Sequence, residues 1–126
     1  MTVLAFGHVN LRAPRELLER LCRFYSEVVG LRVGERPPFR NFGYWLYAGD
    51  QDVLHLSEID PGEQRSATAS ASFDHLAFRC SGRQAVELRL QRLGVAFRTS
   101  HVPATAIVQL FLHDPAGNGV ELSFEG

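Results

Sequence analysis

Residues 6–12 read FGHVNLR, and residues 73–79 read FDHLAFR. The second stretch lies 67 positions after the first, and Phe, His and Arg recur at the same places in both. Self-similarity at a fixed offset is the sign of a duplicated architecture. The 126-residue chain is therefore expected to contain two similar halves, each opening on a strand with a histidine at its centre.

The segments that follow the two heptads also correspond. Each heptad precedes a helical pattern with an apolar stripe: Leu17, Leu18, Leu21, Tyr25 and Val28 in the first half, and Val86, Leu90 and Leu93 in the second. Gly30 and Gly94 are placed to end these helices. Strand-like segments then follow at 31–34, 44–47 and 53–57, and at 96–99, 107–113 and 119–124. Each half thus has the pattern β-α-β-β-β.

The length of the chain favours one domain built from these two modules. We place module 1 at about 1–60 and module 2 at about 73–126. Between them, residues 61–72 read PGEQRSATASAS, a small and polar stretch that is typical of a linker.

Composition excludes several classes of function. Hydrophobic residues make up 45%, charged residues 21%, and the net charge is −1, an ordinary globular balance. No basic excess indicates nucleic-acid binding, and no apolar stretch is long enough to span a membrane. The start, MTVLAFGHVN, has no signal-peptide pattern, so we expect a cytoplasmic protein. Cys22 and Cys80 are expected to be free thiols.

Candidate metal ligands lie at matching places of the repeat. The segment QDVLHLSE (51–58) aligns with NGVELSFE (118–125), so that His55 corresponds to Glu121. Alternate side chains of a strand share a face. His8, His55, His75 and Glu121 would therefore all project from the strand face opposite the aliphatic one. If the sheet curves, the four meet in one cavity. Three imidazoles and a carboxylate suit Zn, Fe, Ni, Co or Mn better than Ca or Mg.

A simpler interpretation exists for each histidine, because a lone histidine on a strand is more often structural than a ligand. His55 could hydrogen-bond beside a site that has only three ligands. His113 is expected at the end of a strand. His101 lies in a probable loop, either on the surface or over the cavity.

These residues resemble the vicinal oxygen chelate superfamily, which includes glyoxalase I, methylmalonyl-CoA epimerase, the fosfomycin and bleomycin resistance proteins and the extradiol dioxygenases. The resemblance covers the whole chain and rests on FGHVNLR, FYSEVVGLRVG, DHLAF and DPAGNGVEL. It implies an α+β fold, in which two βαβββ modules form a curved, partly open barrel of mixed sheet around a divalent metal, with the helices on the outer face. It also implies a homodimer, in which the site lies in one chain or between two.

The resemblance implies a role for each candidate residue. Glyoxalase I and the epimerase have four protein ligands, which fall on His8, His55, His75 and Glu121, although the second is usually Glu or Gln. The dioxygenase set of two histidines and a carboxylate falls on His8, His75 and Glu121. Arg12 stands where glyoxalase I binds a substrate carboxylate, and Arg79 repeats it; a salt bridge at the cavity rim is the alternative.

Three functions remain open on this basis. The favoured one is a glyoxalase-like lyase or isomerase, with Glu121 and the metal-bound His55 at the catalytic centre and a small substrate that chelates the metal through neighbouring oxygens. The second is an Fe(II) or Mn(II) dioxygenase that uses His55 or His101 for acid–base chemistry. The third is a non-catalytic drug-binding protein with a pocket lined by aromatic residues such as Trp45. Ile59 and Phe111 stand where glyoxalase I and the dioxygenases, respectively, carry polar groups.

Overall fold

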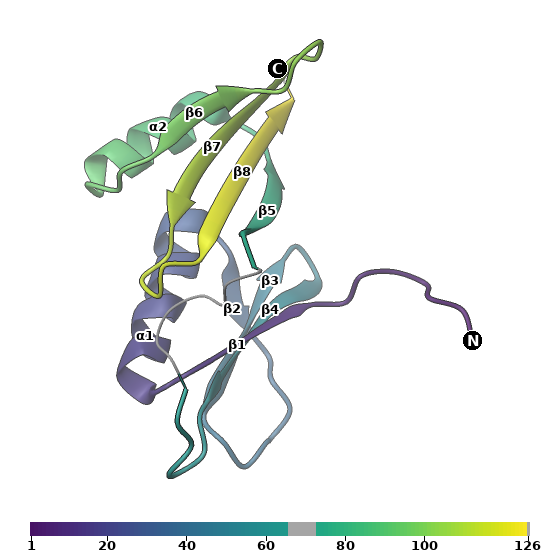
Figure 1. The fold of residues 1–126 in the computed structure, drawn as a ribbon, viewed down its shortest axis with the longest axis vertical. Helices are drawn as coiled ribbons and strands as arrows, with labels where there is room; N and C mark the ends of the chain where they lie inside the picture. The colour runs from purple at the N-terminus through teal and green to yellow at the C-terminus, as the bar shows by residue number, and fades with distance from the viewer. Residues whose placement is uncertain (66–72, 126) are drawn as a thin grey trace. The chain divides into compact units, whose positions relative to one another are not determined.

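The computed structural model describes residues 1–65 and 73–125 (Figure 1). The chain divides into two compact units, Met1–Ala67 and Thr68–Gly126. Part of the expected linker, residues 66–72, lies outside the described residues. No helix in the described ranges has the length and apolar character needed to cross a bilayer.

Unit 1 contains a helical segment and a four-stranded mixed sheet. Its elements are β1 (Val9–Ala13), α1 (Arg15–Arg23), the π-helical turn η1 (Phe24–Val29), β2 (Arg32–Gly34), β3 (Gly43–Ala48) and β4 (Gln51–Glu58). The strand order is β1-β4-β3-β2, so the last strand lies beside the first (Figure 1). β1 and β4 are parallel, whereas the other neighbours are antiparallel.

Unit 2 repeats this topology. Its elements are β5 (His75–Cys80), α2 (Arg83–Arg92), β6 (Arg98–His101), β7 (Ile107–His113) and β8 (Gly119–Glu125). The order is β5-β8-β7-β6, again with one parallel pair, between the first and last strands. The predicted α+β fold with two βαβββ modules is therefore confirmed, with β1 and β2, and β5 and β6, as the outer strands of the two sheets in the described residues.

The aliphatic face of each last strand forms the core of its unit, as predicted. Leu54 and Leu56 on β4 are at most 1% exposed, and Val120, Leu122 and Phe124 on β8 are at most 2% exposed. In unit 1, Leu18, Leu21 and Tyr25 of the helical segment are buried to the same degree. Burial of these side chains removes apolar surface from water, which is the main favourable term in folding. The opposite faces of β4 and β8 carry His55 and Glu121.

The register of the parallel pairs is the same in both units. Asn10 lies opposite His55 in unit 1, and Ala77 lies opposite Glu121 in unit 2. His8 and His75 each stand two residues before the strand residue that faces the candidate ligand on the last strand. Each unit therefore places two candidate donors diagonally across its one parallel pair.

Some boundaries differ from the prediction. β1 begins at Val9, so His8 immediately precedes the strand; an edge strand with a single neighbour frays at its end. Gly30 ends the helical segment in the left-handed region, with φ of 95°, as predicted. Leu93, which was expected in the buried stripe, is 43% exposed because α2 ends at Arg92 and Leu93 only caps it. β6 consequently starts at Arg98 rather than Ala96.

Truncation of either buried leucine should show that the two units use equivalent cores. Leu56→Ala and Leu122→Ala should each lower the free energy of unfolding by about 2–5 kcal/mol, because each leaves a cavity. Urea titration followed by circular dichroism measures the change. Leu88→Ala, at a position on α2 that is 63% exposed, is the control and should change stability by less than about 0.5 kcal/mol. A loss for Leu56→Ala no larger than the control's would contradict the assignment of the core.

Candidate functional site

His55 is the most tightly held candidate in unit 1. It is 7% exposed and lies between two aromatic rings. The indole of Trp45, opposite it on β3, stacks on one face with 3.9 Å between ring centroids and 8° between planes. The imidazole of His8 stacks on it at 3.7 Å and 17°. Two sandwiching rings leave the His55 ring little freedom to rotate.

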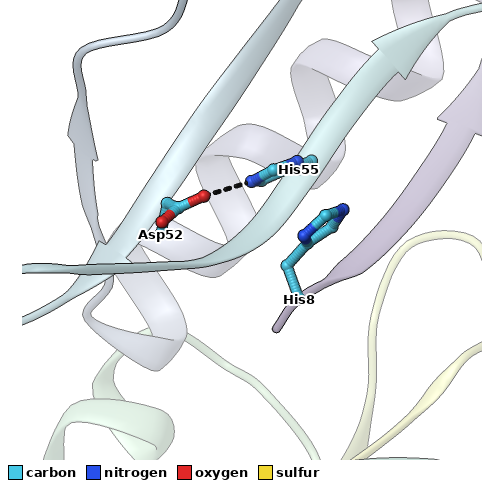
Figure 2. Close-up of side chains that lie close together, drawn as sticks. All are labelled: His8, Asp52 and His55. Carbon is cyan, nitrogen blue, oxygen red and sulfur yellow. Dashed lines mark hydrogen bonds and ion pairs between the residues drawn. The ribbon is translucent and has the colours of Figure 1, made fainter. Parts of the chain in front are cut away.

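A carboxylate fixes the protonation pattern of the same ring. Asp52 Oδ2 lies 2.6 Å from His55 Nε2, and both residues come from β4 (Figure 2). This contact, above all, lowers the pKa of Asp52 below its ordinary value. An ionised carboxylate only accepts hydrogen bonds, so His55 donates Nε2–H, and in the neutral ring the lone pair resides on Nδ1. The Nδ1 atom of His55 is thus the one available to a ligand.

His8, Asp52 and His55 together form a group that could hold a metal ion. Their nitrogen and carboxylate oxygen atoms lie within 4.8 Å of one another. Because the two stacked imidazoles have nearly parallel planes, one cation can lie in both planes only after one ring turns. His8 is exposed and precedes β1, whereas His55 is buried between its neighbours (Figure 2). The donor chemistry fits a transition metal, with His8 as the adjustable member.

Unit 2 holds the second donor pair. His75 Nε2 lies 3.2 Å from Glu121 Oε1. Two ligands bound at about 2.1 Å to one ion lie roughly 3.0–3.4 Å apart in octahedral or tetrahedral geometry, so the observed spacing suits shared coordination. Glu121 is 9% exposed, and its Oε2 accepts a hydrogen bond from Gln109 Nε2 at 3.1 Å. The buried carboxylate is therefore oriented from both sides.

A carboxylate also supports His75. Asp74 Oδ2 lies 2.8 Å from His75 Nδ1, which directs Nε2 toward Glu121. A carboxylate on the second ring nitrogen is the usual support for a metal-binding histidine. Asp52 and Asp74 are supporting residues that the sequence motifs did not predict. The sequence features that could have indicated them are an acid directly before His75 and an acid three residues before His55 on the same strand.

The remaining predicted site residues are placed as follows. Arg12 forms the ion pair that was the alternative to substrate binding, with Nη2 2.6 Å from Glu63 Oε1. Arg79 is exposed on β5, at the place in unit 2 that Arg12 holds in unit 1. His101 ends β6 and is exposed, and His113 ends β7 as predicted. Of the predicted ligands, the structure brings together His8 with His55 and His75 with Glu121.

Comparison with known proteins identifies the family. The chain is 30% identical over 122 residues to an uncharacterized protein of Pseudomonas aeruginosa, matching 93% of this chain and 86% of that one. It is 32% identical over 103 residues to Glyoxylase I 4 of Arabidopsis thaliana, matching 79% of this chain and 59% of the plant protein. The chain belongs to the vicinal oxygen chelate superfamily. A solved member of the superfamily, the glyoxylase/bleomycin resistance protein/dioxygenase domain from Frankia sp. EAN1pec, superposes with a TM-score of 0.74 at 21% identity.

That superposition covers 99% of this chain and 100% of the Frankia domain, which shows that the vicinal oxygen chelate fold extends over both units. No protein-family model matches the chain. Because the chain spans only 59% of the length of the Arabidopsis relative, that protein's activity is not transferred with the fold. The reaction must be argued from the side chains of the two donor pairs.

Removal of the Asp52 carboxylate should end the preference of the neutral His55 ring for a single tautomer. In metal-free Asp52→Ala, we expect the neutral His55 ring to change from one tautomer, protonated at Nε2, to a mixture. Long-range proton–nitrogen correlation spectra in mildly alkaline buffer distinguish the two ring nitrogens. Asp50→Ala, at an exposed acid in the same β3–β4 hairpin, is the matched control and should leave the spectrum unchanged. An unaltered His55 spectrum in Asp52→Ala would refute the role of the carboxylate.

The ion pair of Arg12 should make stability depend on acid pH. Hydrogen bonds from Arg12, from the backbone N–H of Asp60 and from Arg65 lower the pKa of Glu63 from 4.5 to about 2. A depressed pKa contributes stability above the unfolded value, and this contribution is lost as pH falls from 4.5 toward about 2. Urea unfolding of Glu63→Gln should show a shallower loss in that window than the wild type. Glu19→Gln, on the exposed side of α1, should keep the wild-type slope.

Proposed function

We propose that the protein is a metal-dependent lyase or isomerase that acts on a small molecule presenting two neighbouring oxygens. The observation that carries this proposal is the equivalence of the two donor pairs. Each unit places a histidine two residues before the first-strand residue that pairs with the second donor on the last strand. Two structural histidines would not require that coincidence, whereas metal binding by both modules does.

The proposed ligands are His8, His55, His75 and Glu121, for Zn, Ni, Fe, Mn or Co. Imidazole and carboxylate donors match these ions. Such an ion, when bound, polarises a substrate carbonyl as a Lewis acid. Asp52 and Asp74 would hold the rings of His55 and His75 with the correct nitrogen turned toward the centre.

Glu121 is the proposed proton carrier. It is buried, its two oxygens have separate partners in His75 and Gln109, and each oxygen keeps a second lone pair. A carboxylate fixed in this way can take a proton from a carbon next to a carbonyl and return it to a neighbouring position. Gln109 would keep the carboxylate oriented while it does so.

A second candidate function is an oxygen-dependent ring-cleaving enzyme. The specific observation in its favour is the contact between His55 and Asp52. If His55 moves protons with Asp52 behind it, the remaining set of His8, His75 and Glu121 is the two-histidine, one-carboxylate set of iron oxygenases. A small-molecule substrate, a homodimer and a cytoplasmic location belong to both proposals.

Measurement of bound metal distinguishes the residues that bind the ion from those that do not. Purified protein dialysed with each candidate ion should retain one ion per chain, counted by plasma mass spectrometry. His75→Ala and Glu121→Gln should each weaken binding by at least about tenfold, since even supporting groups of metal sites contribute that much. His113→Gln, at the exposed end of β7, should retain the wild-type metal content.

Turnover assays on the same metal-loaded protein distinguish between the candidate reactions. We expect conversion of hemithioacetals or 2-oxoacyl thioesters with at least one ion, and loss of that activity in Glu121→Gln. Oxygen uptake with catechols under iron would instead establish the second candidate. Retention of the ion by both His75→Ala and Glu121→Gln would defeat the metal proposal itself. Metal binding without turnover in either assay would leave a binding protein.

A further inference from the structure

The loop between β2 and β3, residues 35–42, is anchored at both ends (Figure 1). At its start, the carbonyl oxygen of Glu35 accepts a hydrogen bond from the hydroxyl of Tyr47 at 2.6 Å. At its end, the carbonyl oxygen of Phe42 accepts one from the backbone N–H of Glu58 at 2.8 Å. The two donors lie on β3 and β4, so the sheet fixes the points between which the middle of the loop runs.

The middle of the loop, residues 36–41, folds around the side chain of Arg36. Nη1 of Arg36 donates to the backbone oxygen of Asn41 at 3.0 Å, and Nη2 donates to Asn41 Oδ1 at 2.9 Å. The guanidinium also lies over the ring of Phe39, 4.8 Å from the ring centroid. The segment is thus packed by its own side chains, as compact surface loops are. Without the clasp between Arg36 and Asn41, Phe39 would lose the support beneath its ring.

Phe39 carries the aromatic contact of this segment with the sheet. Its ring centroid lies 6.2 Å from that of Trp45 on β3, and the two planes are tilted by 44°. Trp45 in turn stacks on His55. Phe39 nevertheless stays 53% exposed, so only about half of its surface is removed from water. The hydrophobic gain of a contact is proportional to the apolar area that it buries, and this contact can therefore break without disturbing the core.

A cavity of about 180 Å³ lies between this segment and the sheet. Arg36, Phe39 and Asn41 line it on the loop side, and residues of β1, β3 and β4, among them Trp45 and His55, line it on the other. Ligand pockets usually measure about 300–1,000 Å³, so this cavity is smaller than an ordinary ligand needs. The His55 ring borders the cavity and is buried. A molecule that approaches His55 from this side must displace the segment.

The closed arrangement has a cost at Arg36. Its Nε atom is buried and has no acceptor among the described residues. A buried donor without an acceptor is destabilising, because it has lost its hydrogen bond to water. Opening the segment would return Nε to water but would break the two hydrogen bonds to Asn41. Because these effects oppose each other, the closed and open positions differ less in free energy than the clasp alone would suggest.

We propose that residues 36–41 form a lid over the cavity beside His55, that the clasp between Arg36 and Asn41 keeps this lid closed, and that its opening governs the access of small molecules to the His55 ring. The inference rests on the proposed function only in that His55 is a proposed ligand there. Its test uses metal-free protein and no substrate, so failure of the lid and failure of the metal centre give different results.

Chemical modification of His55 measures the opening of the lid. Diethyl pyrocarbonate acylates neutral imidazole rings, and peptide mass spectrometry gives the rate at each histidine under conditions of one modification per chain. His8 is exposed and provides the reference rate within the same sample. In the wild type, His55 should react more slowly than His8, by a factor set by the fraction of time that the lid is open.

Two substitutions of one residue should change this rate in opposite directions. Asn41→Ala removes the Oδ1 acceptor and should raise the rate at His55 by at least about threefold, because a hydrogen bond to a charged group is lost. Asn41→Asp gives Arg36 a charged acceptor and should lower the rate, because charge-assisted hydrogen bonds are stronger than neutral ones. Arg40→Gln, at an exposed position in the same loop, is the matched control and should leave the rate unchanged.

A general loosening of unit 1 is measured in the same samples. Cys22 lies in the core of that unit, and its alkylation by iodoacetamide should be equally slow in the wild type and in both Asn41 variants. Acrylamide quenching of Trp45, the single tryptophan, should follow the rate at His55. Equal rates at His55 in the wild type, Asn41→Ala and Asn41→Asp would overturn the lid. Faster reaction of both His55 and Cys22 in Asn41→Ala, with no decrease in Asn41→Asp, would show that Asn41 is only structural and would also overturn it.

Discussion

The parallel pairing of the first and last strands is the constraint on which both units depend. In each unit it is the one parallel pair, and it joins an edge strand, β1 or β5, to an inner strand, β4 or β8. A slip of one residue would turn every side chain of a strand to the other face. Leu54 and Leu56, or Val120 and Leu122, would then leave the core. The hydrophobic effect that fixes this register therefore also fixes which side His55 and Glu121 face.

The same pairing divides the donors into buried and more exposed ones. His55 and Glu121 stand on inner strands, are buried, and are each held by a polar neighbour, Asp52 or Gln109. Their partners are more exposed: His8 lies directly before β1, and the side chain of His75, at the start of β5, is 36% exposed. Each unit therefore pairs a buried donor on an inner strand with a more exposed one at the beginning of the neighbouring edge strand.

The repeat in the sequence was sufficient to predict the topology, because apolar alternation along β4 and β8 and the glycine after each helix are local signals. The offset of 66 between His55 and Glu121 also corresponds to equivalent places in the register of the two units. The supporting carboxylates could not be found in this way. Asp52 lies three residues before His55, and strand alternation would place the two side chains on opposite faces. Only the folded structure shows the contact between its carboxylate and Nε2. The contact of Arg12 with Glu63 joins residues 51 positions apart and leaves no pattern in the sequence.

The pairing of His55 with Asp52 also bears on the chief departure of this chain from glyoxalase I, the histidine that replaces a carboxylate on the last strand of module 1. An imidazole alone is a different base from a carboxylate, and its replacement removes a negative charge from the site. Here a carboxylate lies behind the ring, where Asp52 accepts the Nε2–H of His55. The lone pair on Nδ1 can therefore hold a ligand or take a proton, but not both at once. On this argument the substitution moves the negative charge of module 1 from the last-strand side chain to the carboxylate behind it.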